Sequence, residues 1–186
     1  VAMPDFPTLS DLGGDDPSAQ APAENRSSAP PSRARQILDW LAGEGFRCDV
    51  DDDGDIHLRH EGRDVFVLLD ADDPAYVRFL VPDVWKCDDD SAERSVALVV
   101  ANTLNSSLKA LKVSLRSNGS VYATVELFLD GFDAFRNVAP RCLDLLGAAT
   151  WEFRSRMREA RQKADDEEAA GRALAEAGAD DDGEQP

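Results

Sequence analysis

An acidic segment with the spacing of a calcium loop is the first candidate for chemistry in this chain. The carboxylates Asp49, Asp51 and Asp53 occupy the first, third and fifth ligand positions, and a glycine follows at the sixth. The twelfth position holds His60, however, where the loop needs a bidentate Glu. The flanking residues also predict strands rather than helices. We therefore interpret the segment as a turn whose carboxylates bond to the turn backbone, with ion binding by the Asp49–Asp55 loop as the open alternative.

Two further pairs contain possible ligands or nucleophiles. His57 and His60 lie three residues apart on a predicted strand, so they point to opposite faces and cannot share a metal ion. Cys48 would lie across from His57 if the turn spans residues 51–54, and the two would separate if the turn is only 53–54. Because no orienting group or oxyanion hole accompanies the pair, we interpret Cys48 as a buried apolar residue beside a polar histidine.

The remaining acids give no sign of acid–base catalysis. They lie in predicted turns and helix caps, where water keeps carboxylates ionised; paired carboxylates act as acid and base only when their environments separate their pKa values. The sequence contains no Gly-rich phosphate loop, GxSxG elbow or HExxH helix. We therefore predict no catalytic residue, no metal site and no cofactor, and hence a protein that is not an enzyme.

Aromatic residues suggest binding instead. Trp85 follows Pro82 at the end of a predicted strand, where burial is less assured than in the strand centre. An exposed Trp is frequent among the residues that dominate protein interfaces. The predicted protein-binding residues are accordingly Trp85, Val84 and Tyr76. An unpaired sheet edge that accepts an extended peptide is a second route to the same function.

The apolar residues define one folded domain between two tails. Of the 186 residues, almost all Ile, Leu, Val, Phe and Trp lie in the middle of the chain. We predict a disordered N-terminal tail over 1–32, an α+β domain over 33–160 and an acidic disordered tail over 161–186, because the flanking segments bury too little apolar surface. The apolar island Phe6–Leu9–Leu12 is the one place where the first tail offers a docking element.

Charge and cysteine content restrict partners and location. The chain has 37 acidic against 20 basic residues, a formal net charge of −17. Such a surface repels phosphate backbones and anionic lipids, so we expect no direct nucleic-acid or membrane binding. Three widely spaced cysteines without a CxxC pair indicate reduced thiols, and no secretion signal or membrane-length apolar run is visible. The predicted location is the cytoplasm.

Periodicity predicts the order of the elements. A helix starts at Ser32 and is followed by strands over 46–50, 55–60, 63–69 and 75–81. A second helix follows the cap Asp90, with Glu93 three residues later. Strands over 112–117 and 120–127 flank Asn118-Gly119, which predicts a type I′ turn. The last helix runs from about Phe132 to beyond Met157 and is kinked or restarted at Pro140.

The fold class follows from that order. The chain reads α-β-β-β-β-α-β-β-α, which predicts an α+β domain with an antiparallel sheet and helices packed on one side.

The middle of the chain also resembles a known family. The resemblance covers about 37–157 and rests on DVDDDGDIHLRHEGRDVFVLLDADDPAYVRFLVP, the ANTLN helix and KALKVSLRSNGSVYATVEL. These segments resemble the YbjN family of bacterial proteins, labelled as sensory-transduction regulators. The resemblance implies a fold similar to the type III secretion chaperones, which are small, acidic and often dimeric. It brings no catalytic residues.

Together these observations predict a non-enzymatic protein-binding regulator or chaperone-like adaptor of the bacterial cytoplasm. Its partner would be a protein or peptide, and the resemblance implies a homodimer. The alternative is a small-ligand or metal-ion-responsive module, which would use the Asp49–Asp55 loop or a pocket between the sheet and the helices.

Overall fold

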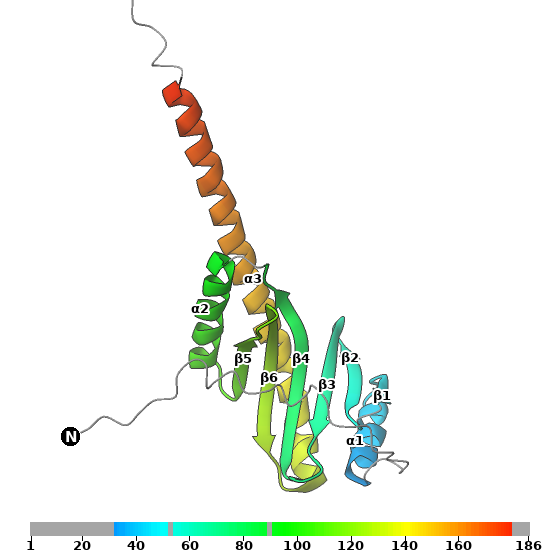
Figure 1. Cartoon of the computed structure of the whole chain (residues 1–186). Helices are drawn as coiled ribbons and strands as arrows, with labels where there is room; N and C mark the ends of the chain where they lie inside the picture. The colour runs from blue at the N-terminus through cyan, green and yellow to red at the C-terminus, as the bar shows by residue number, and fades with distance from the viewer. Residues whose placement is uncertain (1–31, 52–53, 89–90, 180–186) are drawn as a thin grey trace, which may run out of the picture.

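The computed structural model describes residues 32–51, 54–88 and 91–179 and builds them around one six-stranded antiparallel sheet (Figure 1). The strand order across the sheet is β1-β2-β3-β4-β6-β5. The elements are α1 (Ser32–Gly43), β1 (Cys48–Val50), β2 (Ile56–His60), β3 (Arg63–Leu69), β4 (Tyr76–Lys86), α2 (Ser91–Ser107), β5 (Leu111–Leu115), β6 (Ser120–Phe128) and α3 (Gly131–Ala179).

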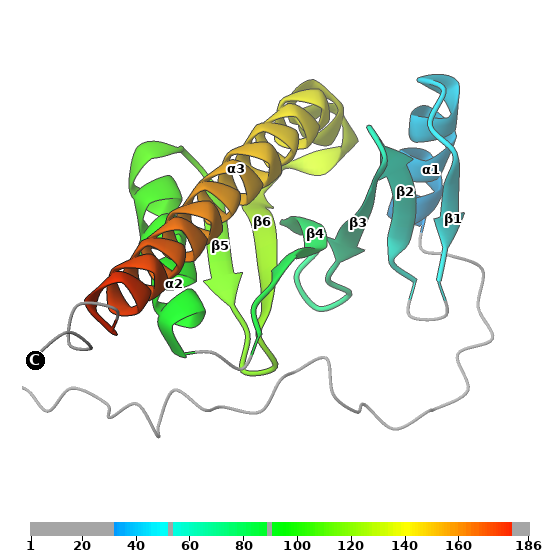
Figure 2. The same ribbon diagram turned by 90° about the horizontal axis from the view of Figure 1, so that it is seen from above.

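All three helices lie on one face of this sheet, as Figures 1 and 2 show from two directions. α1 packs at the β1 end of the sheet, α2 beside β5, and α3 diagonally across β4 and β6. This arrangement confirms the predicted α+β class, the element order and the one-sided helix layer.

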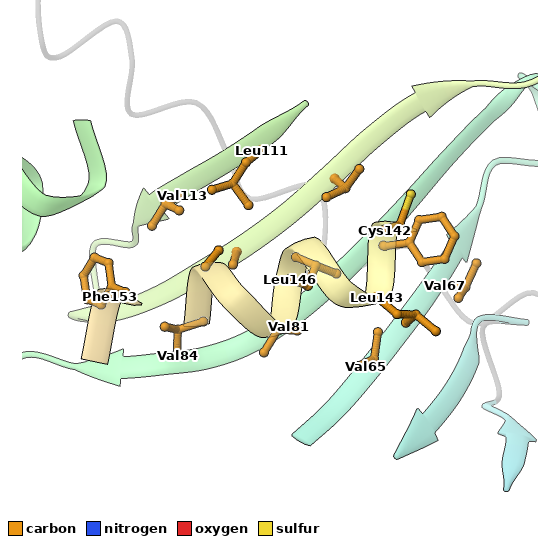
Figure 3. Packing of buried hydrophobic residues seen from close by; sticks show 14 of the residues in the cluster. Val65, Val67, Val81, Val84, Leu111, Val113, Cys142, Leu143, Leu146 and Phe153 are labelled. Atoms are coloured by element: carbon orange, nitrogen blue, oxygen red, sulfur yellow. The ribbon is translucent and has the colours of Figure 1, made fainter. Parts of the chain in front are cut away.

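The core fills the space between the sheet and the helices. Phe79 of β4 stacks on Phe135 of α3, with 5.5 Å between ring centroids, and Trp40 of α1 meets Phe135 edge-on at 5.8 Å. Both phenylalanines are fully buried. Figure 3 shows the same layer further along α3, where Leu146 and Phe153 lie over buried side chains of the strands. Alternate strand residues face this core, as expected for a sheet covered on one side.

Strand β4 is longer than predicted. It continues through Pro82 to Lys86, whereas the prediction ended it near the proline. The pairing with β6 shifts between Val81 and Trp85, and Asp83 there has φ 48°. Such a bulge accommodates a proline inside a strand because the residue needs no ladder hydrogen bond there.

The β5–β6 turn also differs from the prediction. Arg116 N–H donates to the Ser120 carbonyl at 2.8 Å and Gly119 N–H to the Arg116 carbonyl at 2.9 Å, so three residues form the loop. Gly119 has φ 86°, and Asn118 is not among the residues with positive φ, which excludes type I′. A three-residue loop with glycine in the left-handed region forms instead.

Helix α3 extends to Ala179 and passes Pro140 without a break. The predicted disordered tail from residue 161 is therefore wrong over 161–179. Alanine and long charged side chains favour helix there, and ion pairs four residues apart support it, such as Lys163–Glu167 at 3.7 Å and Glu168–Arg172 at 3.2 Å. The predicted cap Asp90, the island Phe6–Leu9–Leu12 and residues 180–186 lie outside the described residues.

Candidate functional site

The face of the sheet opposite the helices is the main candidate surface. Among the described residues, no helix or second sheet covers it (Figures 1 and 2). Its central strands nevertheless present apolar side chains there, in alternation with the buried core positions. These side chains, which we call the open-face cluster, are Phe66, Leu68, Tyr76, Leu80 and Phe128.

Strand register brings the open-face cluster together. Phe66 of β3 is paired with Leu80 of β4, and Tyr76 of β4 with Phe128 of β6. The Tyr76 and Phe128 rings lie 5.6 Å apart. Phe128 is 75% exposed, while the other four are half-buried against one another and their polar neighbours. Large apolar side chains gathered on an uncovered face are a common feature of binding surfaces.

Charged groups border the cluster on the β5 side. Lys112 Nζ lies 2.6 Å from Glu126 Oε2. Arg78 is paired with Glu126 across β4 and β6 and lies on the same face between Tyr76 and Leu80, so it separates the two apolar pairs. Burial raises the pKa of Glu126, but the hydrogen bond and charge of Lys112 outweigh it, so the pKa of this carboxyl lies below its ordinary value. The buried Arg78 Nε has no hydrogen-bond partner. The lowered pKa keeps the Glu126 carboxylate charged at neutral pH.

A histidine between two carboxylates borders the cluster on the β1 side. His57 Nδ1 lies 3.0 Å from Asp49 and Nε2 lies 3.0 Å from Asp64. Its ring also lies 5.0 Å from that of Phe66. The hydrogen bond with Asp64 raises the pKa of His57, burial opposes this, and Asp49 raises it further. The histidine is thus a titratable contact of the apolar cluster.

Comparison with protein-family models gives a match over residues 34–146, to the family described as "T3SS (YopN, CesT) and YbjN peptide-binding chaperone 1", TY-Chap1. The chain belongs to the TY-Chap1 family. The matched segment contains every residue of the open-face cluster. A comparison with curated proteins gives no match.

Two solved structures agree with this TY-Chap1 fold, and a third gives a lower TM-score. YbjN from E. coli is 15% identical, with a TM-score of 0.53 over 69% of this chain and 95% of YbjN. A protein from Methanothermobacter thermautotrophicus is 15% identical, with a TM-score of 0.51 over 69% of this chain and 98% of that protein. The ExoU–SpcU complex of the Pseudomonas aeruginosa type III secretion system includes a chain 19% identical, with a TM-score of 0.41 over 62% of this chain and 96% of that one.

Of the three predicted binding residues, this TY-Chap1 chain places only Tyr76 in the cluster. Val84 is 1% exposed and belongs to the core on the helix side. Trp85 is half-buried on that same side, where its Nε1 donates to Glu93 at 3.0 Å and Arg161 lies over its ring at 4.7 Å. The prediction placed Trp85 at a strand end, but the β4 bulge carries it to the helix layer, so Trp85 and Val84 are not grouped with Tyr76.

The other members of the cluster were missed because the prediction followed strand ends rather than strand faces. The segment RDVFVLL is apolar at successive positions, so both faces of β3 are apolar. Phe66 and Leu68 alternate with Val65 and Val67, which enter the core. A doubly apolar strand in a sheet with helices on only one side was the signal that could have identified them.

The Cys48–His57 pairing, one of two alternatives for this turn, does not form. Cys48 is paired with Leu58, and Asp49 takes the place across from His57, because the turn closes with an Asp51–Asp55 backbone bond of 3.0 Å. This register lies between the two alternatives considered. Burial, with a smaller contribution from Asp49, raises the pKa of the Cys48 thiol, which disfavours the nucleophilic thiolate.

The acidic loop has turn geometry where it is described. Asp51 Oδ1 accepts the Asp55 N–H at 2.9 Å, and Asp49 bonds to His57 rather than facing the loop. Residues 52 and 53 lie outside the described part. Within residues 32–51, 54–88 and 91–179, no group of three or more His, Cys, Asp or Glu side chains is arranged to hold a metal ion.

A cleft of about 590 Å³ lies on the helix side, between α2, α3 and the β2–β3 turn. Leu104 and Leu108 form one wall, and Trp151, which is 66% exposed, stands at its rim. Trp151 lies beyond the segment matched by the TY-Chap1 model. None of the described helices combines the length and hydropathy needed to cross a bilayer.

Proposed function

We propose that this chain is a non-enzymatic, chaperone-like adaptor that holds a segment of a client polypeptide against the open face of its sheet. The observation that carries the proposal is the open-face cluster, an apolar surface that no described element covers. Membership of a family described as peptide-binding chaperones supports the same function.

The surface chemistry indicates the kind of segment that would fit. Phe66, Leu80 and Tyr76 offer apolar contact, and fully burying one Leu or Phe side chain stabilises by about 1.5–3 kcal/mol. The Lys112–Glu126 pair and His57 supply charges of both signs at the border. A client segment with two or three large apolar residues flanked by polar ones matches this layout.

Self-association and location are further parts of the proposal. Leu98 and Val99 of α2 are 55% and 67% exposed on the helix side, away from the open-face cluster. An apolar helix surface of this kind supports a homodimer that leaves the client face free. The net charge of −17 supports an adaptor of the bacterial cytoplasm that contacts neither nucleic acid nor lipid directly.

A pair of matched substitutions tests the client surface. Leu80→Ser removes an apolar side chain from the open-face cluster, and Leu98→Ser makes the same change on α2. The two measurements are fluorescence anisotropy with labelled, Leu- and Phe-rich extended peptides and suppression of aggregation of reduced insulin. Urea denaturation shows that each variant is folded at the assay temperature.

The proposal predicts that Leu80→Ser weakens peptide binding about tenfold or more, close to the loss of one buried side chain. Leu98→Ser is expected to bind like the wild type. Equal binding by both variants and the wild type would place the client site elsewhere, with the cleft beside Trp151 as the next surface to substitute.

A further inference from the structure

Strand β5 forms one edge of the sheet, and a side chain of α2 occupies the outward hydrogen-bonding groups at the centre of that edge. Asn105 of α2 donates from Nδ2 to the Val113 carbonyl at 3.1 Å and accepts the Val113 N–H on Oδ1 at 2.7 Å. An amide that exchanges both bonds with one strand residue reproduces the contact that a neighbouring antiparallel strand would make. The Asn105 amide therefore takes the two hydrogen bonds that a paired strand residue would make with Val113.

Alternation defines the rest of this edge. In an antiparallel ladder, residues two apart direct their N–H and carbonyl groups to the same side. The backbone N–H and carbonyl of Val113 point away from β6, so the backbone groups of Leu111 and Leu115 also point outward. Val113 is the centre of this edge, so the Asn105 bonds lie where a strand pairing would begin.

The two edges of the sheet differ in their protection. At the opposite edge, β1 has only three residues and carries Asp49, and shortness and charge are ordinary defences against strand pairing. Strand β5 has five residues, and its one charged side chain, Lys112, is neutralised by Glu126 at 2.6 Å. The usual lysine defence is therefore weak at β5.

We propose that Asn105 keeps β5 closed to a second copy of this chain, which would otherwise pair with it strand to strand. The proposal concerns an edge distinct from the open-face cluster and is independent of client binding.

A second copy fits because β5 is complementary to itself. Antiparallel pairing about Val113 sets Val113 opposite its own copy, with the two bonds that Asn105 now takes. The same register sets Leu111 opposite Leu115 and Lys112 opposite Ser114. Apolar side chains then share one face, and no like charges face each other.

The test removes the Asn105 side-chain amide and measures the mass of the protein in solution. Asn105→Ala keeps the helix, because alanine is the strongest helix former, and deletes both bonds to Val113. Asn105→Ser is a second variant, whose shorter side chain cannot make both bonds. Asn102→Ala is the control, an exposed asparagine on the same helix. Sedimentation velocity over a range of concentrations measures the mass of each protein, and circular dichroism confirms folding.

We expect Asn105→Ala and Asn105→Ser to reach twice the mass of the wild type and of Asn102→Ala at the same protein concentration. Adding Ser114→Lys to Asn105→Ala should abolish the new species, because it sets a lysine opposite Lys112 twice, and Ser114→Glu should strengthen it. An unchanged mass in both Asn105 variants would overturn the proposal. Association that Ser114→Lys leaves unaffected would also overturn it, because the contact would then not be β5 with β5.

Discussion

The two faces of strand β4 divide stability from recognition within one segment of chain. Val77 and Phe79 face the helices and are fully buried, whereas Tyr76 and Leu80 alternate with them and face outward half-exposed. Both sets are apolar, so residue type does not separate them. The helix layer does: only on its side does an apolar side chain become part of a closed core.

This difference means that equal substitutions on the two faces should have unequal consequences. On the helix side a lost side chain leaves a cavity that the packed layer cannot close. On the open face water fills the space that the side chain leaves, so the stability of the fold changes little. The loss then lowers only the affinity for a bound partner. The comparison can be tested with matched residues on the two sides.

The largest difference is expected between two phenylalanines. Phe135 of α3 is 0% exposed and contacts Trp40 and Phe79, so Phe135→Ala should lower the free energy of unfolding by about 3–5 kcal/mol. Phe128 is 75% exposed on the open face, and Phe128→Ala should change it by less than about 0.5 kcal/mol. Urea denaturation measures both. Similar losses in the two variants would mean that the open face is part of the core.

The sequence predicted the fold because its local signals and its global pattern agree. Strand 63–69 was predicted with its observed bounds, and α1 was predicted from its Ser32 cap. Departures arose where tertiary contacts override local preference. Asn118-Gly119 favours a two-residue turn, but the register of β5 with β6 imposes three residues. Pro82 predicts a strand end, but the bulge extends pairing to Lys86.

The candidate site was predictable only in part, because periodicity identifies faces and not what covers them. Tyr76 was found, while Phe66 and Leu80 were not, since they look like core residues in sequence. Trp85 was chosen for its residue type. Its burial depends on Arg161, which is far along the chain, and no local pattern encodes that contact.

A smaller difference in the free energy of unfolding is expected between substitutions of two glutamates, one on each side of the sheet. Glu93 lies on the helix side with a side chain 10% exposed, and it accepts bonds from Trp85 Nε1, the Asp88 N–H and Arg161. Glu126 on the open face bonds to Lys112, whose side chain is 61% exposed. Glu93→Gln should cost about 1–3 kcal/mol, because the amide cannot satisfy all three donors. Glu126→Gln should cost less than about 1 kcal/mol.

The pH dependence of unfolding provides a second measurement of the role of Glu93. Burial raises the pKa of Glu93, but the bonds from Asp88, Trp85 and Arg161 outweigh it and leave the pKa lowered. Its contribution is therefore present above the unfolded-state pKa and is lost as the pH falls through the folded-state value. Urea denaturation across acid pH should show a steeper loss for the wild type than for Glu93→Gln. Parallel curves would contradict the assigned role.

The smallest effect is expected at His57 on the border of the open face. Its pKa is raised by Asp64 and Asp49, so the stability that it contributes is fully present below the unfolded-state pKa of about 6.5 and is lost as the pH rises through the folded-state value. Because Asp49 and Asp64 are largely exposed, the loss should stay below about 1 kcal/mol. Nuclear magnetic resonance titration of the imidazole gives the pKa directly, and His57→Gln should remove this step from the pH dependence of unfolding. A pKa at or below the ordinary value would show that the two carboxylates do not hold the ring. The open face would then lack a titratable contact beside Phe66, and client binding there should not vary with pH near neutrality.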